Sequence, residues 1–577
     1  MKRLIPLFLC LTLLCGCAQS GDNSTAYDLP ADQTSIVTPQ TQPISYTSRF
    51  DSEILIRLDD GQITFDNEDA VYLSHDIIYY EEKDTYESGL PYGEGAENDK
   101  HTAEEAAAHT VVNITQPGAY RITGTLSAGQ IRVDLGEDAY SNPNAVVELI
   151  LDNADITCTV APAILYLNVY ECDGAWSAEA ASPTVDTGKA GAILVLADDS
   201  ENRVNGSHVA KIYKDKEGEK KLWKQDAALY SYMSMNICGS GTLDLTADNE
   251  GLGTELHLTI NGGNINLRSQ DDGINTNEDG VSVTTINAGN VHIIAGLGTE
   301  GDGIDSNGYL VINGGTVVSS ANPAADAGLD SDLGSYVNGG IVVALGSTMD
   351  WAESDSEQVT MNLQFAEYQN SDCAIVVTRE DGGILFAYDP GEDEVLGENI
   401  RNYMGAVISC PNFRTGETYR VYMDGTLTGT DAGGVFLTET ITGYQNGVQQ
   451  MYTGTDVGMN GPGGLGGFGG QPPEGFEGMP GGGQMPDGGF TPPDSDAQLP
   501  EDGQLPGNGQ FPGNGQPPEN GERPEKPDGE MPQGGFGGQM PGNQAEQLIG
   551  NTKFYMTDKV NCFSGVTAYV PSQMDAE

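Results

Sequence analysis

A glycine-containing turn recurs about every 25 residues in the middle of the chain, and this repeat limits the folds open to it. Gly239-Ser240-Gly241 begins a series whose next last glycine follows 22 residues later, and whose later steps are 26, 26 and 25 residues. A fixed period of this length predicts stacked structural units that share one continuous core. The later turns are Asn261-Gly262-Gly263, Asn287-Ala288-Gly289, Asn313-Gly314-Gly315 and Asn338-Gly339-Gly340.

Apolar residues occupy fixed positions around these turns. No window has the 3.6-residue period of a helix, so short strands are predicted on both sides of each turn. Each repeat is predicted to be one coil of a parallel β-helix, stacked on the next coil at a rise of about 4.8 Å. Three residues before the last glycine the chain has Cys238, Ile260, Ile286, Ile312 and Val337, and two residues after it Leu243, Ile265, Val291, Val317 and Val342. Cys238 is thus predicted to be a small buried residue that faces the core.

A second turn in the repeat carries most of the acidic side chains of this region. Between Asn249 and Asp350 there are 13 carboxylates and one cation, Arg268. Two carboxylates stacked one coil apart repel by roughly 3 to 4 kcal/mol at an effective dielectric constant of 20. Glu250, Asp272 and Asp302 share one position in the repeat, and Asn275, Asp305 and Asp330 share another.

Calcium between the coils would offset this repulsion, because Ca²⁺ takes 6 to 8 oxygen ligands at about 2.3 to 2.6 Å. Twice that length is about one coil rise. The alternative is a solvated acidic face whose repulsion is relaxed by outward rotamers and by salt. The predicted calcium ligands are Asp271, Asp272, Asn275, Glu300, Asp302, Asp305, Asp326 and Asp330.

The overall charge narrows the choice of partners. The chain has 85 acidic and 25 basic residues and a formal charge of −60. Nucleic acid and anionic membrane surfaces are repelled by such a field, so neither is predicted as a partner. A basic segment from Lys211 to Lys224 is the exception, and it is either a solvated loop or an arm that meets an anionic polymer. Its candidate sugar contacts, together with a nearby tyrosine, are Tyr213, Lys220, Lys221, Trp223 and Tyr230, although packing is the favoured role for each aromatic ring taken alone.

The N-terminus has the pattern of a bacterial lipoprotein signal. Lys2 and Arg3 precede an apolar run that is too short to span a bilayer and that ends in Leu14-Cys15-Gly16-Cys17. This pattern predicts cleavage before Cys17, acylation of that residue, and a lipid-anchored protein on the extracellular face of the cell membrane. An ordinary secretory signal is the alternative. Six cysteines then remain, and spacing does not decide whether they pair as disulfides.

The remaining chain divides by composition. Residues 459–545 hold 26 of the 78 glycines and 16 of the 29 prolines, which predicts disorder. The fold class is therefore all-β, a solenoid followed by a small β domain or cap with a Gly/Pro-rich insertion. The predicted domains are a signal peptide and lipobox (1–17), a tether (18–53), a parallel β-helix (54–350), a β-rich domain (351–458), the disordered tract (459–545) and C-terminal strands that return to the β domain (546–577).

Several motifs together resemble a family of bacterial carbohydrate-binding domain-containing lipoproteins. They are the segment 116–124 (QPGAYRITG), the strand 147–153 (VELILDN), and the repeated D-G-I-x-[ST] and N-G-G turns. The resemblance covers about residues 54–458 and the C-terminal strands. It implies a right-handed parallel β-helix similar in fold to pectate lyases, which binds polygalacturonate or cellulose. It also implies calcium at Asp271, Asp272, Asp302, Asp305, Asp326 and Asp330, whereas Glu250 and Ala327 replace the family's Asp at their positions.

Three function classes remain open at this stage. The favoured one is a binder that holds acidic or plant cell-wall polysaccharide through calcium on the turns. A calcium-dependent polysaccharide lyase or glycosidase on the same scaffold is the runner-up. The resemblance implies an Arg or Lys base near calcium for a lyase, and the G-H-G and R-I-K motifs of polygalacturonases are missing from this sequence. A structural surface spacer or adhesin is the third class.

Overall fold

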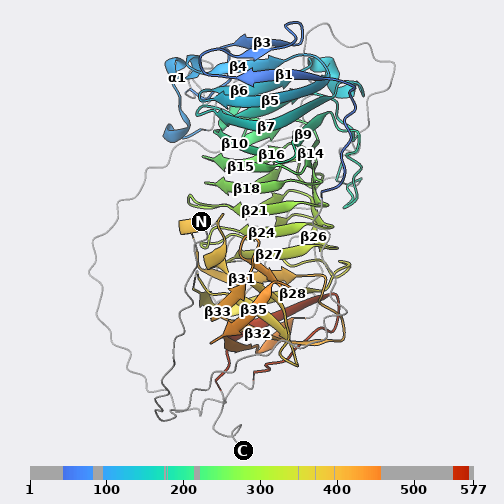
Figure 1. Cartoon of the computed structure of the whole chain (residues 1–577), viewed down its shortest axis with the longest axis vertical. Helices are drawn as coiled ribbons and strands as arrows, with labels where there is room; N and C mark the ends of the chain where they lie inside the picture. Colours follow the sequence, from blue (N-terminus) through green and yellow to red (C-terminus); the bar gives the residue numbers. More distant parts are fainter. Residues whose placement is uncertain are drawn as a thin grey trace, which may run out of the picture.

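The computed structural model describes residues 43–81, 95–173, 177–178, 180–213, 221–347, 350–370, 372–395, 397–399, 401–456 and 550–570. Almost all regular structure in these residues is β, which confirms the all-β prediction. The helix α1 (Ala103–Ala107) is short, and no helix of the described ranges is long and apolar enough to cross a membrane. Figure 1 shows an elongated stack of strands with the N-terminal strands at one end and a second group of strands at the other.

Three ladders of strands run along the stack, and within them the successive strands pair in parallel. The first ladder contains β9 (Ala192–Leu196), β14 (Met235–Gly239), β17 (Leu258–Ile260), β20 (Val283–Ile286), β23 (Tyr309–Ile312) and β26 (Gly334–Val337). The second contains β10 (Glu201–Gly206), β15 (Thr242–Ala247), β18 (Asn264–Ser269), β21 (Asn290–Ile294), β24 (Thr316–Ser320) and β27 (Ile341–Gly346). From β14 onward the chain visits the first, second and third ladders in turn, so each sequence repeat supplies one strand to each.

The third ladder positions the acidic turns. Its strands also pair in parallel, except where β3 (Val71–Ser74) pairs antiparallel with β4 and closes its N-terminal end. The parallel strands are β4 (Thr110–Ile114), β6 (Gly129–Asp134), β8 (Ile164–Asn168), β13 (Ala227–Ser231), β16 (Glu250–Thr254), β19 (Ile274–Thr276), β22 (Ile304–Ser306) and β25 (Asp330–Ser331).

The N-terminal end of the stack is built from longer strands. β5 (Gly118–Leu126) and β7 (Val147–Thr157) pair in parallel and each runs through both the first and the second ladder. β1 (Glu53–Leu58) pairs in parallel with β5 and antiparallel with β2 (Thr64–Phe65). A hairpin of β11 (Val209–Tyr213) and β12 (Lys221–Gln225) leaves the stack between β10 and β13. Short 3-10 turns lie at Glu97–Asp99 and Glu137–Ser141.

The predicted apolar columns form the core, with one correction. Ile260, Ile286 and Ile312 are in register across the first ladder and have at most 1% of their surface exposed. The residue that pairs with Ile260 is Ile237, so the placement of Cys238 in this inward column was wrong. The turn between β14 and β15 is one residue longer than the later turns, because Ile237 and Thr242 enclose four residues where Ile260 and Asn264 enclose three. Cys238 is buried, as predicted, but it faces outward.

Glycine serves two different purposes in the two turns of the repeat. The last glycines of the N-G-G type turns have positive φ, for example +94° at Gly263 and +93° at Gly289, a conformation that side chains disfavour. The glycines of the acidic turns are needed for space instead. A Cβ on Gly251 would come within 2.5 Å of the carbonyl oxygen of Gly273 on the next coil. Gly273 and Gly303 face the carbonyls of the following coils in the same way.

The second group of strands covers the last coil. β31 (Tyr403–Ser409) pairs antiparallel with both β27 and β28 (Thr360–Gln369), so it protects an edge that would otherwise be open. β39 (Val560–Ala568) pairs in parallel with β28, although residues 457–549 between them lie outside the described residues. The other strands are β29 (Ile375–Arg379), β30 (Ile384–Tyr388), β32 (Thr418–Met423), β33 (Thr426–Gly429), β34 (Val435–Leu437), β35 (Ile441–Gln445), β36 (Val448–Met451), β37 (Gly454–Asp456) and β38 (Phe554–Tyr555), with 3-10 turns at Pro390–Glu392 and Gly397–Asn399.

The cysteines divide into the predicted lipidation site and six others in the described residues. The predicted lipidation site, Cys17, lies outside the described residues. Of the six cysteines that remain after it, the structure describes five as free thiols, which are Cys158, Cys172, Cys238, Cys373 and Cys410. The sixth, Cys562, accepts a hydrogen bond at Sγ from Asn362 Nδ2 at 3.3 Å.

A partly buried histidine between two carboxylates gives the stack a pH-dependent element. His208 Nδ1 lies 3.1 Å from Asp248 Oδ1, and Nε2 lies 3.4 Å from Asp99 Oδ1. Burial lowers the pKa of His208, but its hydrogen bonds and charge interactions with Asp248 and Asp99 outweigh burial and raise that pKa from 6.5 to about 10. The contacts of protonated His208 with Asp248 and Asp99 therefore stabilise the fold fully below pH 6.5. This contribution is lost as the pH rises through about 10.

We expect His208→Gln to lower the free energy of unfolding by about 1 to 3 kcal/mol below pH 6.5, and by much less above pH 10. Urea unfolding at the two pH values measures the difference. The exposed His75 provides the control, since His75→Gln leaves the Asp99 and Asp248 contacts in place. An equal loss at both pH values would mean that the imidazole contributes only packing.

Candidate functional site

Carboxylates are stacked along the third ladder and the turns that precede its strands, and we call this group the acidic ladder. In strand register Asn275 pairs with Asp305, and Asp305 with Asp330, so the predicted second column is present. The amides of Gly251 and Gly273 donate to the carbonyls of Asp272 and Asp302, which aligns the first column. The members of the acidic ladder are Glu250, Asp271, Asp272, Asn275, Asp302, Asp305, Asp326 and Asp330.

Backbone amides from the next coil hold these carboxylates in place. The amide of Asp302 donates to Asp272 Oδ1 at 2.7 Å, and the amide of Ala327 donates to Asp302 Oδ1 at 2.6 Å. Asn275 Nδ2 donates to Asp272 Oδ2 at 3.1 Å and to Glu250 Oε1 at 3.2 Å. Each carboxylate oxygen can accept more than one hydrogen bond, so the ladder combines fixed orientation with remaining acceptor capacity.

Burial and mutual repulsion make the charged forms of these groups unfavourable. Burial, followed by the charge of Asp271, raises the pKa of Asp272 to about 7. Burial also raises the pKa of Asp302 and of Asp305 to about 8, with neighbouring carboxylates adding to the shift. The pKa of Glu250 is raised for the same reasons, although Lys224 opposes the change. A cation within the ladder would remove this cost by favouring the charged carboxylates.

Two cations approach the ends of the acidic ladder, and sequence reasoning missed both. Lys224 Nζ forms a 2.7 Å ion pair with Asp226 and lies close enough to Glu250 for their charges to interact. Arg401 interacts with Asp326, while its Nη2 donates to the carbonyl of Ser320 at 2.8 Å. Neither residue lies in the repeats, so only the hairpin and the second group of strands bring them close. Arg268, the one cation within the repeats, instead donates from Nε to the carbonyl of Val395.

The donor atoms of the acidic ladder suit a hard cation, but they do not form a finished site. Among the described residues, no three His, Cys, Asp or Glu side chains are close enough together to hold a metal by themselves. Two oxygens in the ladder are nevertheless buried without a hydrogen-bond partner, Glu250 Oε2 and Asn275 Oδ1. A buried acceptor without a donor is costly, and Ca²⁺ accepts both carboxylate and amide oxygens as ligands. The residues present therefore fit calcium in their chemistry.

The predicted metal ligands separate into two groups by position. Seven of them belong to the acidic ladder, whereas Glu300 is exposed and affects the ladder only through its charge on Asp271. Asp350 was not predicted, because it follows the last repeat. It accepts a hydrogen bond from Ser331 Oγ at 2.9 Å, and burial raises its pKa to about 6. The C-terminal end of the ladder thus contains one more carboxylate than expected.

The predicted sugar contacts are only partly described, and one of them is wrong. Tyr230 is fully buried, packs edge to face against Tyr232 with ring centroids 5.3 Å apart, and donates from its hydroxyl to Glu255. It cannot stack on a sugar, because its ring is inside the molecule. Lys220 lies outside the described residues. Tyr213, Lys221 and Trp223 belong to the β11–β12 hairpin.

Comparisons with known proteins agree on a sequence family. Residues 108–363 match the family model described as "Carbohydrate-binding domain-containing protein". A protein with the same description from Acetivibrio thermocellus is 32% identical over 178 residues, which are 30% of this chain and 51% of that protein. The chain thus spans about half the length of that relative. A solved structure of the polysaccharide lyase-like protein from C. thermocellum, a gadolinium derivative, is 23% identical, covers 50% of this chain and 93% of its own, and has a TM-score of 0.30.

Proposed function

Because residues 108–363 match a family of carbohydrate-binding domain-containing proteins, we propose that this protein binds polysaccharide through calcium held on the acidic ladder. The observation that supports it most is the stack of partly buried carboxylates together with the unpartnered oxygens of Glu250 and Asn275, since such a stack gains most from a divalent cation. The ligand class that follows is a polysaccharide rich in carboxylates or hydroxyls, of the polygalacturonate or cellulose type.

The residues that would hold calcium lie on successive coils. Asp272 and Asp302 each accept a backbone hydrogen bond from the next coil at Oδ1, which fixes how both carboxylates are oriented, and Asp272 Oδ2 also accepts from Asn275. Asn275 and Glu250 add the unpartnered oxygens, and Asp305 and Asp330 continue the second column. When bound, calcium would offer positive coordination positions to sugar oxygens, which would allow a protein of charge −60 to hold a polyanion.

The finer fold and the location belong to the same proposal. We infer that the three parallel ladders form a right-handed parallel β-helix, with one coil for each repeat. The lipobox ending at Cys17 supports a lipid anchor on the outer face of the bacterial membrane. Together they would hold the ladder outside the cell, where polysaccharide is present.

Binding is favoured over elimination because the nearby cations are suited to charge compensation. Interactions with Asp226 and Glu250 outweigh burial and raise the pKa of Lys224, so it stays protonated and makes a poor base. Both Nη atoms of Arg401 donate to backbone carbonyls. A polysaccharide lyase needs a base that is unprotonated near neutral pH, so that it can accept the proton removed from the sugar. A glycosidase or a surface spacer remains the weaker alternative.

A glycan array probed with the purified protein, in calcium and in excess chelator, tests the function. We expect signal on polyuronates in calcium and at least tenfold less signal in chelator, because the bridging cation is removed. Polygalacturonate incubated with the protein is followed in parallel for ultraviolet absorbance from unsaturated uronides. Appearance of that absorbance would favour the lyase, and retention that is unchanged in chelator would exclude calcium bridging.

A further inference from the structure

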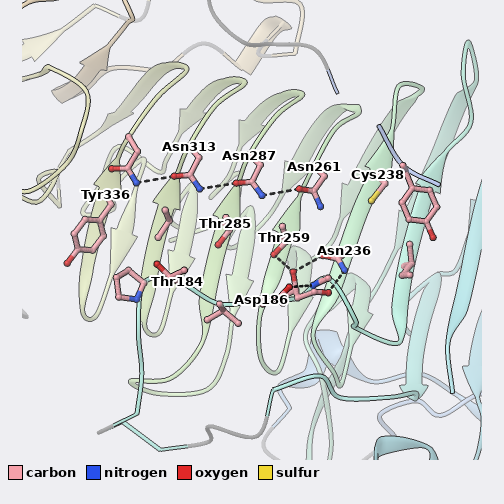
Figure 2. A pocket seen from close by; sticks show the side chains of 18 of the residues that line it. Thr184, Asp186, Asn236, Cys238, Thr259, Asn261, Thr285, Asn287, Asn313 and Tyr336 are labelled. Carbon is pink, nitrogen blue, oxygen red and sulfur yellow. Dashed lines mark hydrogen bonds between the residues drawn. The ribbon is translucent and has the colours of Figure 1, made fainter. Parts of the chain in front are cut away.

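A groove of about 660 Å³ lies on the outer face of the first ladder, away from the acidic ladder. Figure 2 shows it along several coils, with the asparagines of the N-G-G type turns on one side and the segment that contains Thr184 and Asp186 on the other. The side chains that point outward from one ladder of short strands therefore form a continuous floor.

Two columns of side chains make up the floor. Strand register aligns Asn236, Thr259, Thr285, Val311 and Tyr336 in one column, and the asparagine ladder forms the other. The floor spans five strands, so its length is roughly 19 Å at about 4.8 Å for each coil. Thr285 and Tyr336 are only partly buried. The asparagine ladder consists of Asn261, Asn287, Asn313 and Asn338.

Two segments wall the groove opposite the floor and at one end of it. The segment 183–188 is fixed by Thr187, whose Oγ1 bonds to Thr259 Oγ1 at 2.7 Å and whose carbonyl accepts from Asn236 Nδ2 at 2.7 Å. Arg49 Nη2 donates to the carbonyl of Gly188 at 2.7 Å, which joins this segment to residues 46–49. Because both walls are hydrogen-bonded to the floor or to each other, the groove is preorganised rather than formed by loose loops.

The asparagine ladder provides a regular row of amides. Asn287 Nδ2 donates to Asn261 Oδ1 at 2.9 Å, Asn313 donates to Asn287 at 2.9 Å, and Asn338 donates to Asn313 at 3.0 Å. Each amide has two N–H donors and two acceptor positions, and the inner members Asn287 and Asn313 use one of each within the ladder. The remaining donor and acceptor repeat once for each coil, which suits a ligand with repeated hydroxyl groups.

The charges that line the groove disfavour an anionic ligand. The lining contains three carboxylates, Asp186, Asp355 and Glu357, and one cation, Arg49. Arg49 already donates to the carbonyl of Gly188. Apart from Val311 and the ring of Tyr336, the two columns of the floor carry amides and hydroxyls, unlike the apolar centre typical of protein interfaces. Tyr336 provides a partly exposed aromatic ring at the edge of the floor, which is suitable for contact with a sugar face.

We propose that this groove binds a neutral, hydroxyl-rich glycan chain lying along the stack, with Tyr336 under a sugar ring and the asparagine ladder bonded to its hydroxyls. The proposal rests on the carbohydrate-binding function proposed above and adds a second, calcium-independent site to it. The acidic ladder would then hold charged polysaccharide and the groove would hold uncharged chains.

Calorimetry of the full chain in excess chelator tests the groove, with neutral β-linked hexasaccharides of glucose, mannose and xylose as probes. We expect at least one of them to bind, and Tyr336→Ala and Asn287→Ala each to weaken its affinity by about tenfold. Matched controls are Tyr368→Ala, an exposed tyrosine outside the groove, and Asn290→Ala, which loses an inter-coil amide bond on the other side of the same turn. Thermal unfolding of each variant separates lost affinity from lost folding.

Three results would overturn the groove proposal. They are no binding by any of the neutral hexasaccharides, equal losses of affinity in the groove variants and their controls, and a dimer that Tyr336→Ala dissociates, since a second copy would then occupy the groove. The calcium-dependent function can fail independently. Loss of polyuronate retention in the array leaves the hexasaccharide binding in chelator unaffected, and the reverse also holds.

Discussion

Replacing Asp302 and Asp305 together by Asn is expected to destabilise the protein in calcium and to stabilise it in chelator. Without calcium the two partly buried carboxylates meet the charges of Asp272 and Asp330, and Asn removes both the charge and its desolvation cost while keeping an acceptor oxygen. With calcium the same change removes two anionic ligands. Calcium at a hundred times its dissociation constant stabilises a fold by about 2.7 kcal/mol, so a loss of about 2 to 3 kcal/mol is expected.

Thermal and urea unfolding in the two conditions measure this reversal of sign. Asp51→Asn combined with Asp138→Asn is the matched control, because both residues are exposed and the net charge changes equally. The control is expected to shift stability by less than about 0.5 kcal/mol in either condition. If the Asp302 and Asp305 variant behaved like the control, the ladder would be a solvated acidic face, the alternative that the sequence had left open.

Gly273→Ala is expected to lower the free energy of unfolding by about 3 to 5 kcal/mol, with or without calcium. A Cβ at this position would overlap the carbonyl oxygen of Gly303 on the next coil and a methyl group of Ile293. The carbonyl belongs to the inter-coil hydrogen bonds, so relief of the overlap requires two coils to move apart. The same expectation extends to Gly303, whose Cβ would overlap Ser319 and Gly328.

Gly61→Ala is the control, since its Cβ would meet only the Asp59 carboxylate at 3.2 Å, a side chain that can rotate. Chemical denaturation followed by circular dichroism compares the two variants. A cost below about 1 kcal/mol for Gly273→Ala would show that the spacing between coils adjusts easily. Calcium would then be the main element that fixes the acidic turns.

The sequence alone predicted the architecture of the repeats well. The recurring N-G-G type turns and their flanking apolar positions predicted an all-β chain, and Ile260, Ile286 and Ile312 do lie in one buried column. The resemblance to carbohydrate-binding domain-containing proteins, inferred from motifs, is confirmed by the comparisons. The calcium ligands, the lipid anchor and the domain boundaries stay predictions. Such features recur at a constant interval in the sequence because every coil packs against its neighbours in the same way.

Features without a period were the ones that the sequence did not reveal. Cys238 was placed one position wrongly because one turn is a residue longer, and the strand period of two moves such a residue to the opposite face. Tyr230 was named as a candidate sugar contact, with packing as the favoured alternative, and its ring is buried. An aromatic residue next to a charged segment has no local signal that distinguishes the two cases.

The sequence by itself determined what repeats: the turns, the inward columns and the register of the acidic ladder. Only the tertiary structure decided what comes from elsewhere in the chain, such as Lys224 and Arg401 at the ladder ends and the segment 183–188 that walls the groove. The physical reason is that inter-coil contacts join residues separated by one constant interval, which a sequence displays directly. Contacts made by the hairpin, the connecting loops and the second group of strands have no constant interval, so only the folded chain brings their residues together.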